Sequence, residues 1–160
     1  MNMVSSVAPG TFSAKEAAVR AGLAYHLVDS WARGDAPIVS PSVPSSGQGT
    51  RRAYSFRDVV ALRVASQLPS VGVRSQLIRA AVAAVQIEVT GIDRPSVVPR
   101  EAWVIVNAAG ANAVAVRTSA ELKRASAIAD PIAIVIDVGG IACQLAAPTN
   151  RRFTLPKRGR

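Results

Sequence analysis

Two adjacent arginines, Arg51 and Arg52, are the side chains whose type and setting most clearly suggest a chemistry. They follow residues 41–50, a stretch rich in Pro, Ser and Gly that contains no acidic residue. A guanidinium group offers paired N–H donors that match the oxygens of a phosphate. Because no carboxylate lies close to them in the sequence, we expect these arginines to bind phosphate groups rather than to form structural ion pairs.

The residues that usually support catalysis or metal binding are scarce. His26 is the only histidine and Cys143 the only cysteine, which excludes an intramolecular disulfide and a thiolate cluster for a metal. Neither residue has a neighbour that would complete a nucleophile–base pair. We therefore predict that the protein is not an enzyme, that it holds no metal or cofactor, and that Cys143 is a buried, unreactive side chain.

The positive charge is concentrated at the two ends of the chain. The 160 residues carry a net charge of +9, and residues 1–86 hold nine basic and four acidic side chains. Residues 87–150 hold five basic and six acidic ones, whereas residues 151–160 hold five basic and none acidic. This distribution favours a polyanionic partner, with a solvated surface selected for solubility as the alternative.

Two short helices joined by a tight turn are predicted near the start. Ser13 and Glu16 have the spacing of a capping box, and Gly22 is suited to end the helix that they begin. A second helix is expected from Tyr25 to Arg33, with Leu27, Val28 and Trp31 on its apolar face. Helices of this length around a three-residue turn are typical of a helix-turn-helix.

A wing and two further helices are predicted next. Residues 38–40 and 52–54 have the composition of two strands that flank the Pro/Ser/Gly-rich loop. Ser55 and Asp58 form a second capping-box pattern ahead of a helix that ends near Pro69 and Gly72. A fourth helix is expected over residues 75–85, which carry apolar side chains at helical spacing.

The second half of the chain reads as a small α+β unit. We expect strands at residues 103–106 and 113–117, a helix from Thr118 to Ile128, a strand at 132–136 and a final helix at 138–146. The complete prediction is an α+β protein with a disordered segment 1–11, a DNA-binding domain 12–86, a linker 87–100, a domain 101–147 and a basic tail 148–160. A unit of about 50 residues is marginal alone, so it is expected to pack on a partner or on the first domain.

These motifs resemble one family. The stretch AGLAYHLVDSWARGD, the Gly/Ser loop that leads into RRAYSFRDVVALRV, and SVGVRSQLIRAAV are similar to the winged helix-turn-helix of MerR-type transcriptional regulators, especially the actinobacterial branch with a small C-terminal domain. The similarity spans about residues 12–85. It implies binding of double-stranded DNA, with the second helix in the major groove and the wing on the flanking backbone.

The resemblance assigns candidate DNA contacts to specific residues. The exposed face of the second helix would present four of them, and the wing with the helix after it would present the others: Tyr25, His26, Asp29 and Arg33, then Arg51, Arg52, Tyr54 and Arg57. Departures from the family pattern include Ala24, where relatives often have a Thr or Ser cap. Residues 87–160 contain no heptad helix, so the dimerisation coiled coil of the metal-sensing members is absent.

Three functions remain open from the sequence. The first is a cytoplasmic transcriptional regulator that dimerises through its C-terminal half and has either no effector, an apolar small ligand or a protein partner. The second is an architectural DNA-binding protein similar to phage excisionases. The third is an antitoxin or adaptor whose C-terminal half binds another protein. A metal effector is not expected.

Overall fold

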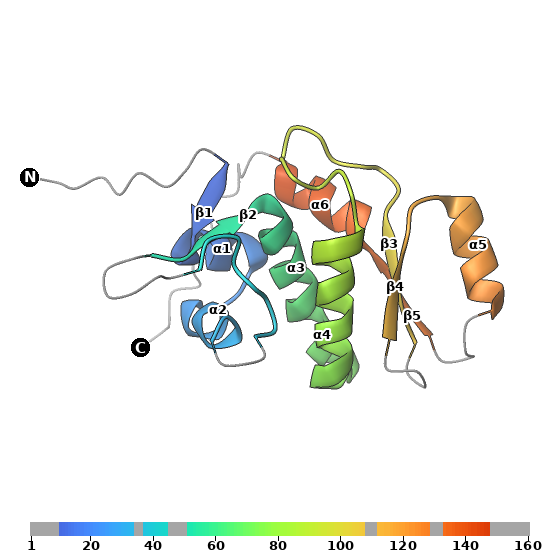
Figure 1. Cartoon of the computed structure of the whole chain (residues 1–160), viewed down its shortest axis with the longest axis horizontal. Coiled ribbons are helices and arrows are strands. Elements are labelled where there is room, and N and C mark those ends of the chain that lie inside the picture. The colour runs from blue at the N-terminus through green and yellow to red at the C-terminus, as the bar shows by residue number, and fades with distance from the viewer. Residues whose placement is uncertain (1–9, 34–36, 45–50, 108–111, 129–132, 148–160) are drawn as a thin grey trace, which may run out of the picture.

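The computed structural model describes residues 10–33, 37–44, 51–107, 112–128 and 133–147, and it confirms the α+β class. The first half consists of β1 (Thr11–Ser13), α1 (Ala14–Ala21), α2 (Tyr25–Trp31), β2 (Ala53–Ser55), α3 (Phe56–Gln67), a 3-10 turn η1 (Leu68–Val71), α4 (Ser75–Ala83) and a π-helical turn η2 (Ala84–Glu88). The second half consists of β3 (Trp103–Asn107), β4 (Asn112–Val116), α5 (Ser119–Ile128), β5 (Ala133–Asp137) and α6 (Val138–Ala146). Figure 1 shows α3 and α4 between the N-terminal helices and the C-terminal strands.

Both predicted capping boxes are formed. Ser13 and Glu16 start α1, and Ser55 and Asp58 start α3, each with reciprocal hydrogen bonds. The hydrogen bonds from the backbone and hydroxyl of Ser13 lower the pKa of Glu16. Gly22 ends α1 with a left-handed φ of 70°, and a Cβ at this position would lie 2.7 Å from the Arg63 guanidinium. Glycine is therefore favoured there for its backbone conformation, whereas the close contact involves the end of a flexible arginine side chain.

The predicted strand pairing around the wing is wrong. β2 pairs antiparallel with β1, a strand that lies at the edge of the segment expected to be disordered, with Phe12 opposite Tyr54. Residues 38–40 form no strand, and only a single bridge between Val43 and Ala53 closes the loop. The prediction failed because the three-residue β1 is too short to give a periodic signal, and its partner lies about 40 residues away in the sequence.

The C-terminal strands form an antiparallel sheet with the order β4-β3-β5. This confirms the predicted hairpin and third strand. Asp137 caps α6 by accepting a hydrogen bond from the Gly140 backbone N–H at 2.8 Å. A Cβ on Gly139 would lie 2.8 Å from the Arg100 carbonyl oxygen. Gly139 thus allows α6 to pass close to residues 99–102.

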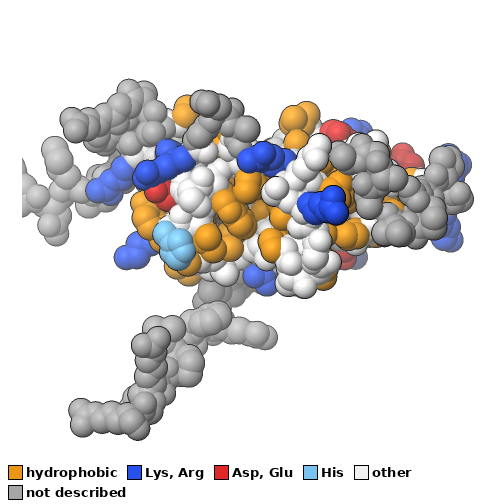
Figure 2. Space-filling model, turned by 90° about the horizontal axis from the view of Figure 1, so that it is seen from below, with side chains coloured by type: hydrophobic (Ala, Val, Ile, Leu, Met, Phe, Trp, Pro, Cys, Tyr) orange, Lys and Arg blue, Asp and Glu red, His pale blue; other side chains and the backbone are white. Residues whose placement is uncertain are grey.

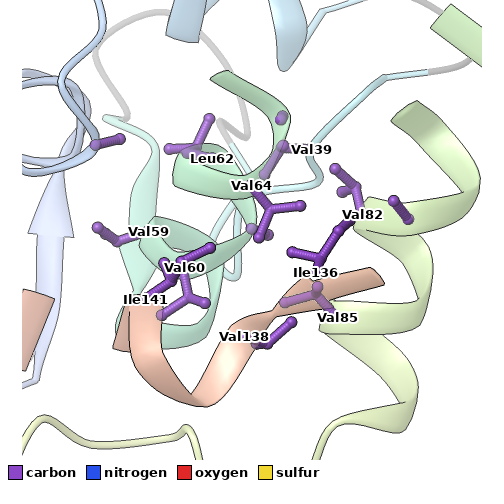
Figure 3. Packing of buried hydrophobic residues seen from close by; sticks show 14 of the residues in the cluster. Val39, Val59, Val60, Leu62, Val64, Val82, Val85, Ile136, Val138 and Ile141 are labelled. Atoms are coloured by element: carbon purple, nitrogen blue, oxygen red, sulfur yellow. The ribbon is translucent and has the colours of Figure 1, made fainter. Parts of the chain in front are cut away.

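One hydrophobic cluster joins the two halves of the chain. It contains Val60 of α3, Val82 of α4, Ile136 of β5 and Val138 of α6, which converge in Figure 3. The cluster also includes residues of the segment expected to be a linker, Val89 and Ile92, which are 3% and 0% exposed. The C-terminal unit therefore packs on the first half of its own chain, one of the two arrangements expected for so small a unit.

No helix in the described ranges is long and apolar enough to cross a bilayer.

Candidate nucleic-acid interface

The turn between α1 and α2 is built by backbone hydrogen bonds and one buried anchor. The Leu23 N–H donates to the Ala18 carbonyl at 2.9 Å, which closes α1 immediately before α2 begins. Val28 of α2 is fully buried, and Trp31 packs on the core with part of its surface exposed. At the end of α2 the Ile38 N–H donates to the Trp31 carbonyl at 2.8 Å. These contacts hold α2 against the core by one face only.

The opposite face of α2 is open at its first turn. Tyr25 is 56% exposed and His26 is also exposed, in agreement with their predicted placement. Ala24 supplies no side-chain cap to the helix. Figure 2 shows the molecule from below, with Lys and Arg side chains spread over this face. The first turn of α2 therefore presents donors and an aromatic hydroxyl to solvent.

Asp29 binds two of the predicted DNA-contacting arginines. Its Oδ2 lies 2.5 Å from Nη2 of Arg33, and its Oδ1 accepts a hydrogen bond from Nη1 of Arg52 at 2.7 Å. The expectation that Arg52 lacks a structural ion pair is thus wrong, because folding brings α2 beside the return of the loop. Arg33 remains 67% exposed, whereas Arg52 is 21% exposed.

Arg51 differs from Arg52 in its surroundings. It is exposed, and within the described ranges no carboxylate pairs with it. A phosphate can therefore reach its guanidinium without displacing a carboxylate of the described ranges.

Tyr54 is not open, contrary to the expectation from the sequence. The side chain has no exposed surface and its hydroxyl meets no hydrogen-bond partner in the part of the chain that the structure describes. Burial raises the pKa of this phenol above 10. Because β2 lies between β1 and the Val43 bridge, Tyr54 contributes to the core and is left out of the interface that we propose.

Arg57 is also engaged in the fold. Its Nη2 lies 2.7 Å from Oδ1 of Asp93, and its Nη1 donates to the Gln86 carbonyl at 2.8 Å. Gln86 lies in η2, and Asp93 lies just beyond it. The side chain therefore links α3 to that segment, and we also leave it out of the proposed interface.

The structure identifies a buried residue that the sequence showed only as a helix cap. Asp58 is 3% exposed, and its Oδ2 accepts hydrogen bonds from the N–H and hydroxyl of Ser42 at 2.9 and 2.6 Å and from the Ser55 N–H at 2.8 Å. Its Oδ1 accepts from Gln86 Nε2 at 2.8 Å, and the same nitrogen lies 3.0 Å from the Ser40 carbonyl oxygen. This Asp58 network fixes the segment between α2 and the loop. The Ser55–Asp58 spacing predicted one of these contacts and none of the others.

Metal chemistry has no support in the described ranges. No group of three or more His, Cys, Asp or Glu side chains is close enough there to hold an ion. Cys143 is exposed rather than buried as expected, because it lies on the outer side of α6.

The chain is similar to transcriptional regulators over part of its length. It is 40% identical over 63 residues to an uncharacterised HTH-type transcriptional regulator of Mycobacterium bovis, and equally to counterparts in two strains of Mycobacterium tuberculosis. The match covers 39% of this chain and 27% of each relative, so the chain spans only about a quarter of their length. No protein-family model matches the chain.

Proposed function

We propose that the protein is a transcriptional regulator of the MerR type that binds double-stranded DNA as a dimer. The observation that carries this proposal is the combination of an exposed first turn of α2 with two arginines beside it, Arg33 and Arg52, which we call the basic cluster. Tyr25 and His26 would face the base edges of the major groove, because a helix of this size fits that groove. The regulators with which the chain shares sequence support the same function.

The loop between Val43 and Ala53 would serve as the wing on the DNA backbone. Arg51 is its exposed cation, and Arg33 at the end of α2 is a second one. In this proposal Asp29 has an orienting role, since it holds Arg33 and Arg52 on one side of α2. Two guanidinium groups around one carboxylate leave a net positive charge, which favours phosphate binding.

Any effector would act on the C-terminal unit and would be apolar or a protein. The described part of this unit has no metal cluster, whereas a mainly apolar groove of about 370 Å³ lies between its β5 and α6 and the α3 and η1 of the first half. That volume lies within the range of small-molecule sites. The groove is a weaker argument than the basic cluster, because its lining offers few polar groups to orient a ligand.

The proposal is tested by selecting duplexes that the purified protein retains from a random library and measuring their affinity. We expect a preferred sequence that binds roughly 10³-fold more tightly than an unrelated duplex, the lower end for specific recognition. Equal affinity for both duplexes would contradict a sequence-specific regulator. A footprint that extends cooperatively over several repeats would instead favour an architectural protein, the alternative that shares this DNA-binding surface.

A further inference from the structure

The two outer strands of the C-terminal sheet have different free edges. The N–H of Ala115 in β4 donates to Oε2 of Glu88 at 3.1 Å, and η2 and α4 pack against this strand. The outward edge of β4 is thus covered by its own chain. The same hydrogen bond shows that the backbone N–H of Ala115 points outward from the sheet.

Backbone N–H and carbonyl groups point alternately to the two sides of an antiparallel strand, so the orientation of Ala115 fixes that of the residues in β5. Because Ala115 directs its N–H away from β3, its partner Val104 directs its backbone groups toward β5, where it lies opposite Ile136. The N–H and carbonyl of the next residue, Val135, therefore point away from the sheet. No segment in the described ranges pairs with this edge.

The exposed edge of β5 lacks the features that usually prevent pairing. Residues 133–136 read Ala-Ile-Val-Ile, without a charge or a proline, and Val135 is 48% exposed. Edge strands that remain unpaired commonly carry Lys, Pro or a bulge. An uninterrupted apolar edge is therefore expected to accept another strand.

A groove lies along the same edge and extends the core face of the sheet. Leu68 and Val71 at the end of α3 and in η1 line it on one side, and Ile141 of α6 lines it on another. Val71 is 66% exposed, although it borders this apolar surface. The helices thus extend past β5 and leave space beside the strand.

We propose that this edge pairs with β5 of a second copy of the chain, antiparallel and related by a two-fold axis at Val135. The two Val135 residues would exchange their backbone hydrogen bonds, and each Asp137 would lie opposite Ala133 of the other copy. The two Asp137 carboxylates would be about 14 Å apart, four residues at roughly 3.4 Å each, so they would not repel strongly. Among the described residues that line the groove, Asp137 is the one that carries a charge, and its place at the strand end suits a symmetric partner.

The outer face of the sheet supports the same occupant. Val114, Ile105 and Val135 lie side by side across β4, β3 and β5, and both valines are about half-exposed. Edge-to-edge pairing joins this row to its copy across the two-fold axis. Cross-strand apolar contacts of this kind stabilise sheets. The proposal gives the dimer of the proposed regulator its interface, although strand pairing does not itself depend on DNA binding.

A matched pair of lysine substitutions in the full chain tests the proposal by sedimentation analysis. Val135→Lys places like charges opposite each other at the axis and should raise the dimer dissociation constant at least about tenfold. Val114→Lys changes a valine of similar exposure, 45%, on the covered strand β4 and should leave the constant within about twofold. Circular dichroism verifies that both variants fold. A monomeric wild-type chain at about 100 μM, or equal effects of the two substitutions, would overturn the proposal.

A crosslinking variant gives a positive test that does not rely on loss of structure. With Cys143→Ser removing the exposed native thiol, Val135→Cys should form a disulfide-linked dimer under mild oxidation, because residues of a hydrogen-bonded pair have Cα atoms about 5.5 Å apart. Val114→Cys in the same background should remain unlinked. Dimers that persist in Val135→Lys while Val135→Cys fails to crosslink would show that the copies meet elsewhere.

The same variants separate this proposal from the DNA-binding one. A Val135→Lys monomer that still binds a single half-site would support both proposals. A wild-type chain that crosslinks through Val135→Cys but binds no duplex would leave the β5 interface standing and remove the regulator. A wild-type monomer that instead captures an apolar ligand in the groove would exclude the second copy as its occupant.

Discussion

The starts of α2 and α3 show how differently one small protein builds two helix entries. At α3, Ser55 caps the helix, and buried Asp58 accepts hydrogen bonds from Ser42, Gln86 and Ser55 itself. At α2, Ala24 supplies no side-chain cap, and the residues after it are exposed. The first turn of α3 is thus anchored in the core, whereas the first turn of α2 is open to solvent. The helix proposed to read DNA is positioned mainly by contacts at its far side.

The largest expected effect comes from removing the carboxylate of the Asp58 network. Asp58→Ala leaves the backbone N–H groups of Ser42 and Ser55 without their acceptor, and we expect a loss of about 3 kcal/mol in the free energy of unfolding. Urea denaturation measures this loss. Glu16→Ala, which breaks the exposed capping box of α1, is the matched control and should cost about 1 kcal/mol. Equal losses in the two variants would show that burial adds nothing to the α3 entry.

A smaller effect, of opposite sign, is expected at Tyr54, the residue that precedes this entry. Tyr54→Phe removes a buried hydroxyl that has no partner in the described ranges and should raise the free energy of unfolding by about 1 kcal/mol. Tyr25→Phe, at the exposed tyrosine of α2, should change it by less than about 0.5 kcal/mol. A destabilised Tyr54→Phe variant would mean that the hydroxyl does form a hydrogen bond.

The same tyrosine predicts a pH dependence. Its folded-state pKa is raised above the unfolded value of about 10, so the folded chain retains a proton that the unfolded chain loses. The stability associated with the neutral phenol is therefore complete below pH 10 and is lost as the pH rises through the folded-state pKa. Denaturation midpoints between pH 9 and 11 should fall more for the wild type than for Tyr54→Phe.

Local signals were readable from the sequence and long-range contacts were not. The Ser13–Glu16 and Ser55–Asp58 spacings placed both helix starts correctly, because a capping box is set within four residues. The Asp29–Arg52 ion pair joins residues 23 apart and depends on how the loop returns to α2. The pairing of β1 with β2 depends equally on the tertiary fold. Tyr54 was misplaced for the same reason, since an aromatic residue near a loop can face either side of a strand.

The candidate site shows the same division. The exposure of Tyr25 and His26 agrees with the resemblance, which placed them on the exposed face of α2, away from the buried Val28. Which arginines are available depended on the positions of Asp29 and Asp93, two acids that are distant in sequence from Arg52 and Arg57 respectively. Sequence reasoning therefore identified the exposed first turn of α2 but overestimated the number of cations available beside it.

The salt dependence of DNA binding tests the central claim most directly. Each phosphate contact on duplex DNA contributes roughly 0.9 to the slope of log affinity against log salt concentration. Arg51→Ala should reduce the slope by about that amount and weaken all duplexes alike. Lys123→Ala, on α5 far from α2 in Figure 1, removes the same charge and should leave the slope unchanged. A slope unaffected by Arg51→Ala, or reduced equally by Lys123→Ala, would contradict a DNA interface formed by α2 and the adjacent loop.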